Sequence, residues 1–205
     1  MTTKQWYRAL LEDQVLMSPA AANSPAGILP CRVELLNTNT DWACTWSLAR
    51  TRGIGSDLTG FLFRLIHQLL PTKDRTSRMA VDDPSDIPGR CPVCRAATED
   101  QLHAFFDCPN NSVCGLALLG YVQTTVSNLS PEEALRLELG GGHDEVEQLA
   151  TVCLLSTGLQ YIWEARTEKK LVSLFRMRSE IEARITILRR TRHAAAGDKM
   201  MEMMN

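Results

Sequence analysis

Three cysteines and one histidine near the middle of the chain constrain its fold more than any other feature. They are Cys91, Cys94, His103 and Cys108, with the spacing C-x2-C-x8-H-x4-C. Thiolate sulfur and imidazole nitrogen are preferred ligands of Zn²⁺, and four of them at such intervals can surround one ion as a tetrahedron. Because four protein ligands leave the metal no open position, the spacing predicts a structural zinc site rather than a catalytic one. The alternative is a set of buried thiols beside a surface histidine.

The same spacing predicts a distortion of the backbone. Residues 99–107 should form a short helix that carries His103. A regular helix turns about 100° per residue, so His103 and Cys108 would not share a face. Pro109 also disfavours helical geometry at Cys108, so we expect the helix to end or distort between the two ligands. Glu99, one turn before His103, is a candidate to hold the second ring nitrogen of His103, the alternative being a solvated surface glutamate.

Length and composition are those of an ordinary globular chain. The 205 residues suit one domain with an appended arm, or two small domains, and are enough for a hydrophobic core. Seven cysteines, an odd number, with no leading signal segment favour a reducing compartment, cytoplasm or nucleus, over a secreted disulfide scaffold. The most apolar run, residues 149–163, is shorter than the ~20 residues that span a bilayer, so no membrane partner is expected.

Periodic apolar residues predict a mainly α fold: a helical domain with a small zinc-stapled hairpin (Cys3His) and a long C-terminal helix. Residues 1–50 should be an N-terminal helix and linker, and residues 51–128 a helix followed by the zinc-binding region. Residues 129–193 should be a C-terminal helical region, and residues 194–205 a disordered tail. The individual elements are expected at 4–17, 31–36 (a brief strand), 40–50, 56–70, 99–107, 110–126, 144–165 and 167–192, with a short helix from Pro131.

Residues with capping chemistry mark three helix starts. Ser56 or Asp57 can cap the helix over 56–70, and Asn110 or Asn111 can cap the helix after the zinc motif. The third start, Ser130-Pro131-Glu132-Glu133, combines a serine cap, a proline at the first helical position and acids in the first turn.

The last predicted helix carries a stripe with the 3-4 alternation of a coiled coil. Its members are Leu171, Leu174, Arg178, Ile181, Ile185 and Leu188. The stripe favours pairing with a partner helix or self-association with a second copy. Arg178 weakens this interpretation, because a lone charge buried in such a seam is costly.

Charge is segregated along the chain although the formal net charge is only −2. Residues 50–78 carry six basic and two acidic residues (+4), residues 164–193 nine and four (+5), and residues 130–147 one and six (−5). Basic segments can follow a phosphate backbone, so RNA or DNA is a candidate partner; alternatively these charges solvate helix faces or pair along them. The candidate nucleic-acid-binding residues are Arg64, Lys73, Arg75, Arg78, Arg90, Arg95, Arg184, Arg189, Arg190 and Arg192.

Candidates for catalysis are poor. Asp82 and Asp83 could suggest a polymerase metal pair, but they lie in a proline-rich loop without a strand pattern. The glycine run 140–142 lacks the lysine and the preceding strand of a phosphate-binding loop. No serine–histidine–acid arrangement can be argued either. The sequence therefore predicts a protein that is not an enzyme.

The zinc motif and its flanks resemble a known family. The quoted stretches are F-L-F-R-L from Phe61, L-P-T-K-D-R from Leu70, C-P-V-C from Cys91, T-E-D from Thr98, H-A-F-F from His103 and D-C-P from Asp107. They are similar to the zinc-binding region near the C-terminal end of reverse transcriptases of non-LTR (LINE-like) retrotransposons. The resemblance covers roughly residues 57–122 well and residues 157–193 loosely.

That resemblance implies a zinc site at Cys91, Cys94, His103 and Cys108, in a region thought to help hold template RNA or target DNA. The polymerase motif, an aromatic-x-Asp-Asp hairpin, is absent, and no endonuclease-like acidic pattern follows Cys108. The resemblance thus implies a detached C-terminal piece without polymerase activity that binds RNA or DNA. The alternatives are a protein-interaction module that uses the C-terminal helix, or a non-functional relic.

Overall fold

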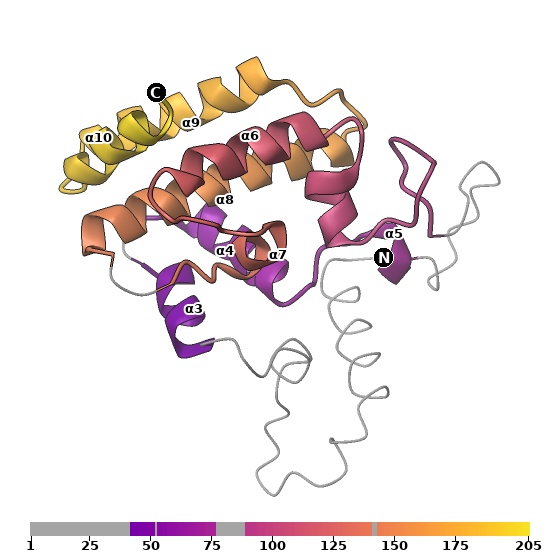
Figure 1. Cartoon of the computed structure of the whole chain (residues 1–205), viewed down its shortest axis with the longest axis horizontal. Coiled ribbons are helices and arrows are strands. Elements are labelled where there is room, and N and C mark those ends of the chain that lie inside the picture. Colours follow the sequence, from indigo (N-terminus) through magenta and orange to yellow (C-terminus); the bar gives the residue numbers. More distant parts are fainter. Residues whose placement is uncertain (1–41, 52, 77–88, 141–142) are drawn as a thin grey trace, which may run out of the picture.

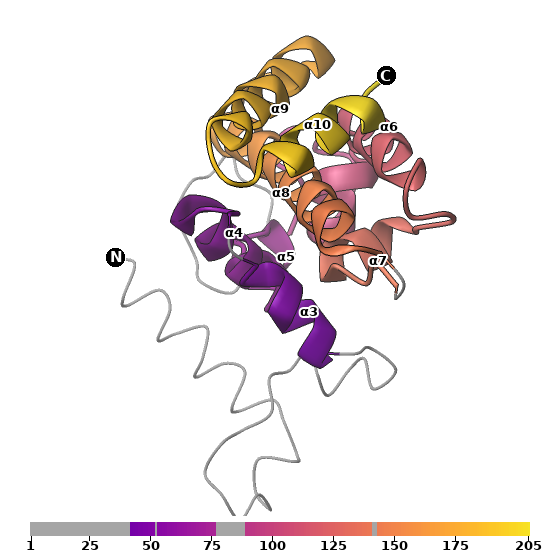
Figure 2. The same cartoon turned by 90° about the vertical axis from the view of Figure 1, so that its left-hand side faces the viewer.

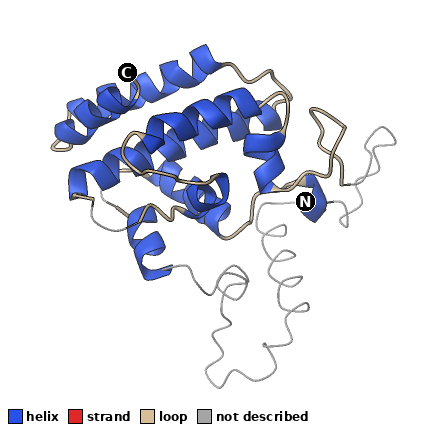
Figure 3. Cartoon of the chain, viewed as in Figure 1, coloured by secondary structure: helices blue, strands red, loops and turns tan. Residues whose placement is uncertain are grey.

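The prediction of a mainly helical chain is confirmed. The computed structural model describes residues 42–51, 53–76, 89–140 and 143–205. Within them all regular secondary structure is helical, and Arg90 and Thr98 form one isolated antiparallel bridge (Figure 3). The elements are α3 (Trp42–Ala49), α4 (Ser56–Ile66), α5 (Lys73–Thr76), η3 (His103–Asp107), α6 (Ser112–Gln123), α7 (Pro131–Arg136), α8 (Glu145–Thr167), α9 (Leu174–Arg189) and α10 (Ala194–Met203).

The predicted helix over 4–17, the strand over 31–36 and the Asp82–Asp83 pair lie outside the described residues. So does Arg78, and the Arg75 side chain is not described either.

Helix α8 is the centre of the core. It packs against α4, α6, α9 and α10 and also touches α3 and η3. Figures 1 and 2 show α9 and α10 along one side of α8, with α3 and α4 on the other. Most of its residues are buried, including every position from Leu149 to Leu159, as expected for a helix enclosed on all sides. No helix in the described part of the chain is both long and apolar enough to cross a membrane.

The helix predicted over residues 167–192 is shorter in the structure, where α9 covers Leu174–Arg189. Helix α8 ends at Thr167, Lys169 adopts a positive φ of 54°, and α9 begins at Leu174 after Ser173 as its N-cap. Ile181 and two other members of the predicted stripe, Ile185 and Leu188, are buried in the core of this same chain. That part of the stripe is therefore not available to pair with a second copy.

The prediction of a disordered tail over 194–205 is wrong. Residues Ala194–Met203 form α10, which packs on both α9 and α8. Met200 is fully buried, and Met203 and Met204 are only 3% exposed. Alanine and methionine favour helix, and these methionines complete the core between α8 and α9.

The predicted caps are partly confirmed. Ser130 forms the full capping box of α7 with Glu133. At α4 the N-cap is Gly55, not Ser56 or Asp57, and the helix ends at Ile66 because Gln68 has a positive φ of 54°. Asn111 occupies the N-cap of α6, but its side chain makes no capping bond there.

Candidate metal centre

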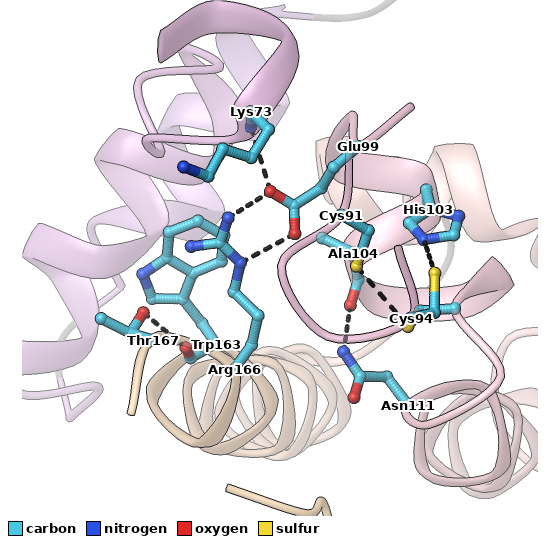
Figure 4. A network of polar contacts seen from close by, with 11 residues as sticks. Lys73, Cys91, Cys94, Glu99, His103, Ala104, Asn111, Trp163, Arg166 and Thr167 are labelled. Atoms are coloured by element: carbon cyan, nitrogen blue, oxygen red, sulfur yellow. Dashed lines mark hydrogen bonds and ion pairs between the residues drawn. The ribbon is translucent and has the colours of Figure 1, made fainter. Parts of the chain in front are cut away.

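The structure brings together the four predicted ligands. Cys91, Cys94, His103 and Cys108 place one ligand atom each within 4.8 Å of all the others. Cys91 Sγ lies 3.9 Å from Cys108 Sγ, and Cys94 Sγ lies 3.3 Å from His103 Nε2 (Figure 4). Zinc–sulfur and zinc–nitrogen bonds of ordinary length would set such tetrahedral edges at about 3.6–3.8 Å. The cluster therefore has the size and donor set to hold a metal ion.

A π-helix resolves the conflict between His103 and Cys108. Residues His103–Asp107 form η3, in which the Cys108 N–H donates to the His103 carbonyl five residues earlier at 2.8 Å. The wider turn lets both side chains reach the same centre, and Cys108 itself is extended with ψ 124°. The predicted distortion is confirmed. Asn111 stabilises it, because its buried amide donates to the Ala104 carbonyl at 2.7 Å.

A tight turn positions the first ligand pair. The Arg95 N–H donates to the Cys91 carbonyl at 2.9 Å, and Arg95 adopts a positive φ of 59°. The Cys91 N–H donates in turn to the Ala97 carbonyl at 2.9 Å. The Arg90 guanidinium closes the loop by donating to the carbonyls of Arg95 and Ala96 at 3.3 and 3.0 Å. The turn is thus held by its own backbone.

Burial raises the pKa of the three cysteine thiols, whereas hydrogen bonds from backbone N–H groups lower it. Burial raises the pKa of Cys94, but hydrogen bonds from Ala96 and Ala97 and from His103 outweigh it and lower the pKa to about 7. Burial raises the pKa of Cys91, and it raises the pKa of Cys108 to about 12. Backbone groups also bond Cys91 and Cys108. These contacts favour thiolates, the form in which cysteine ligates a metal.

Glu99 has a role that neither sequence interpretation anticipated. It does not hold His103, and it is not solvated, because its side chain is completely buried. The guanidinium of Arg166, near the end of α8, donates to both carboxylate oxygens of Glu99, and the Lys73 N–H adds a third bond at 3.0 Å (Figure 4). Arg166 also stacks 4.6 Å above the Trp163 ring. The loop over residues 89–102, called the zinc loop after the predicted site, is therefore tied to α8 and to the start of α5.

Arg166 could not be predicted as the partner of Glu99, because the two residues are 67 positions apart in the chain. The one signal in the sequence is an arginine in the last turn of a largely buried helix, which does not identify the carboxylate that it meets.

Those candidate nucleic-acid-binding residues whose side chains the structure describes do not form one group. Arg184 is paired with Asp57 at 2.9 Å, and Arg189 with Asp198 at 2.7 Å, so part of the charge of α9 is neutralised within the chain. Lys73 is half-buried beside Glu99. Besides Arg189, the exposed members are Arg64 on α4, Arg90 and Arg95 on the zinc loop, and Arg190 and Arg192 after α9.

The zinc loop lies far from the C-terminal end of α9 (Figure 1). The exposed candidates of the zinc loop and those after α9 therefore lie at different ends of the molecule.

Comparison of the chain with models of protein families, with curated proteins and with solved structures gave no match.

Proposed function

We propose that this chain is a non-catalytic, zinc-stapled helical module that binds RNA or DNA. The observation that carries the proposal is the closed cluster of Cys91, Cys94, His103 and Cys108. Three sulfurs and one nitrogen in a tetrahedral arrangement suit Zn²⁺ best among common ions. With all four positions filled by protein, the ion would be structural rather than catalytic.

The surroundings of the cluster support a folding role for the ion. The loop before η3 has little core of its own, whereas Ala104, Phe105 and Phe106 of η3 are buried against the helical body. A metal that joins the loop to η3 would therefore contribute its binding free energy to folding.

Two observations support nucleic acid as the partner. Arg90 and Arg95 are exposed on the zinc loop, and the backbone of that loop is held in a fixed shape. The resemblance of residues 57–122 to the zinc-binding region of non-LTR retrotransposon reverse transcriptases adds RNA or target DNA as the expected ligand. Because the net charge is −2, binding would depend on such local groups rather than on the whole surface.

Titration of binding against salt tests the proposal. The zinc-loaded chain, with one zinc per chain by elemental analysis, is mixed with labelled RNA and DNA oligonucleotides at several salt concentrations. We expect log Kd to rise linearly with log salt, by about 0.9 per phosphate contact on duplex DNA. Arg95→Ala should lower that slope by about 1, because one contact is lost.

Two variants control this experiment. Arg189→Ala alters an arginine already paired with Asp198 and should leave the slope unchanged. Cys108→Ser should lose the zinc and, with it, the binding. One zinc per chain together with no binding of any oligonucleotide would refute nucleic-acid recognition and leave the cluster as a purely structural site.

A further inference from the structure

The connection between α8 and α9 exposes large apolar side chains. Phe175 is 82% exposed, Leu171 78% and Leu174 39%. The exposure is not a consequence of a loose segment, because the Ser173 N–H donates to the Tyr161 hydroxyl at 3.1 Å and Val172 packs against the core. Exposed apolar clusters of this kind on a fixed surface mark contact sites.

Basic residues flank these apolar residues in the sequence. Lys169, Lys170 and Arg176 are all exposed, and Glu168 is the one acidic residue between positions 167 and 179. The ion pair between Lys170 and Glu168 spans 2.6 Å, but both side chains are more than half exposed. Such a surface pair contributes little and separates readily when a stronger anion arrives.

The zinc loop lies at the same end of α8. Arg166 is three positions before Lys169, and it binds Glu99, which is four positions after the exposed Arg95. Figure 1 shows the loop and the α8–α9 connection together at this end of the molecule. Basic residues of two separate segments thus lie at the same end of the molecule as the connection that leads to the exposed Phe175.

We propose that this end of the molecule binds single-stranded nucleic acid, with the Phe175 ring stacked on a base. Lys169, Lys170, Arg176 and Arg95 contact the phosphates on either side. The inference rests on the proposed function and adds the class of nucleic acid and the residue that selects it.

A flat exposed ring can stack only on a base that is free of its own partners, and such bases occur in single strands, not within a duplex. A nucleic-acid strand carries a phosphate beside each base, so one strand can meet both the aromatic ring and the basic side chains.

The test uses the zinc-loaded full chain and a 15-nucleotide DNA that contains one 2-aminopurine, either single-stranded or annealed to its complement. Anisotropy gives Kd, and 2-aminopurine fluorescence reports stacking directly. We expect tighter binding of the single strand and a fluorescence change on binding. Phe175→Ala should weaken single-strand binding about 10- to 100-fold, leave its salt slope unchanged and alter duplex binding less than about 2-fold.

Two further variants test whether the loss of binding is specific to the stacking surface of Phe175. Phe175→Trp retains a stacking surface and should keep the wild-type affinity. Ile187→Ala removes another exposed apolar side chain of α9, 55% exposed and about 18 Å farther along the helix, and should leave Kd within about 2-fold.

Each other outcome overturns the inference in a recognisable way. If Phe175→Ala binds the single strand like wild type with the same salt dependence, the stacking role is wrong while the proposed function stands. If wild type binds neither form, the proposed function fails as well. If sedimentation shows that wild type self-associates, that Phe175→Ala does not, and that single-strand affinity is the same in both, the surface docks protein instead.

Discussion

Gly115 determines how closely α6 approaches η3. A Cβ at this position would collide with the carbonyl oxygen of Phe105 and lie 2.9 Å from the Phe106 ring. Both neighbours are buried in a close-packed interior and have little room to withdraw. We therefore expect Gly115→Ala to lower the free energy of unfolding by about 2–3 kcal/mol in urea denaturation of the zinc-loaded protein.

Gly120, five residues later on the same helix, is the matched control. It is exposed, and no atom lies within 4 Å of the position of its Cβ. Alanine there should raise the free energy of unfolding by up to about 1 kcal/mol, because alanine favours helix more than glycine does. Equal effects of the two substitutions would contradict the role of close contact at Gly115.

Among the elements, α7 depends on the reciprocal cap between Ser130 and Glu133. The Ser130 N–H donates to the Glu133 carboxylate at 2.7 Å, and the Glu133 N–H donates to the Ser130 hydroxyl at 3.2 Å. Ser130→Ala should cost about 1 kcal/mol of unfolding free energy at neutral pH. The exposed Ser127, in the turn before α7, provides a control in which alanine should have no measurable effect.

The same cap predicts a dependence on pH. The hydrogen bonds from the Ser130 backbone and side chain lower the pKa of Glu133 from its usual 4.5. A carboxyl group with a lowered folded pKa contributes its full stability above 4.5 and loses it as the pH falls through the folded value. The cost of Ser130→Ala should therefore shrink below pH 4.5. A cost that stays constant down to pH 2 would show that the Glu133 charge plays no part.

At the scale of the whole molecule, the ion pair between Glu99 and Arg166 joins the zinc loop to α8. Arg166→Ala would leave the buried Glu99 carboxylate without its cation, at a cost of about 3 kcal/mol in unfolding free energy. Lys170→Ala removes an exposed ion pair and should cost less than about 1 kcal/mol. Similar small losses in both variants would contradict the structural importance of the buried pair.

Helix α10 closes the core at the end of the chain. Met200 is fully buried between α10 and its neighbours, so Met200→Ala should cost about 2–4 kcal/mol in thermal or urea unfolding. Glu202, which is largely exposed on the same helix, should tolerate alanine within about 0.5 kcal/mol. Unchanged stability of the Met200 variant would mean that α10 adds nothing to the core.

Local chemistry was enough to predict several features. The four ligands could be chosen from residue type and spacing, because metal coordination demands both. The distortion between His103 and Cys108 followed from the pitch of a helix, and the α7 start from the chemistry of Ser130 and Glu133. Each of these depends on residues at most 17 positions apart in the chain, so the sequence alone determined them.

Tertiary structure decided the remaining features. Glu99 meets Arg166 and Arg184 meets Asp57 only because segments distant in sequence pack side by side. The same packing turned Ile181, Ile185 and Leu188 of α9 inward and made a helix of the predicted tail, since both helices bury side chains against the core. Burial and ion pairing over such distances are properties of the assembled core, and no short-range pattern in the chain carries that information.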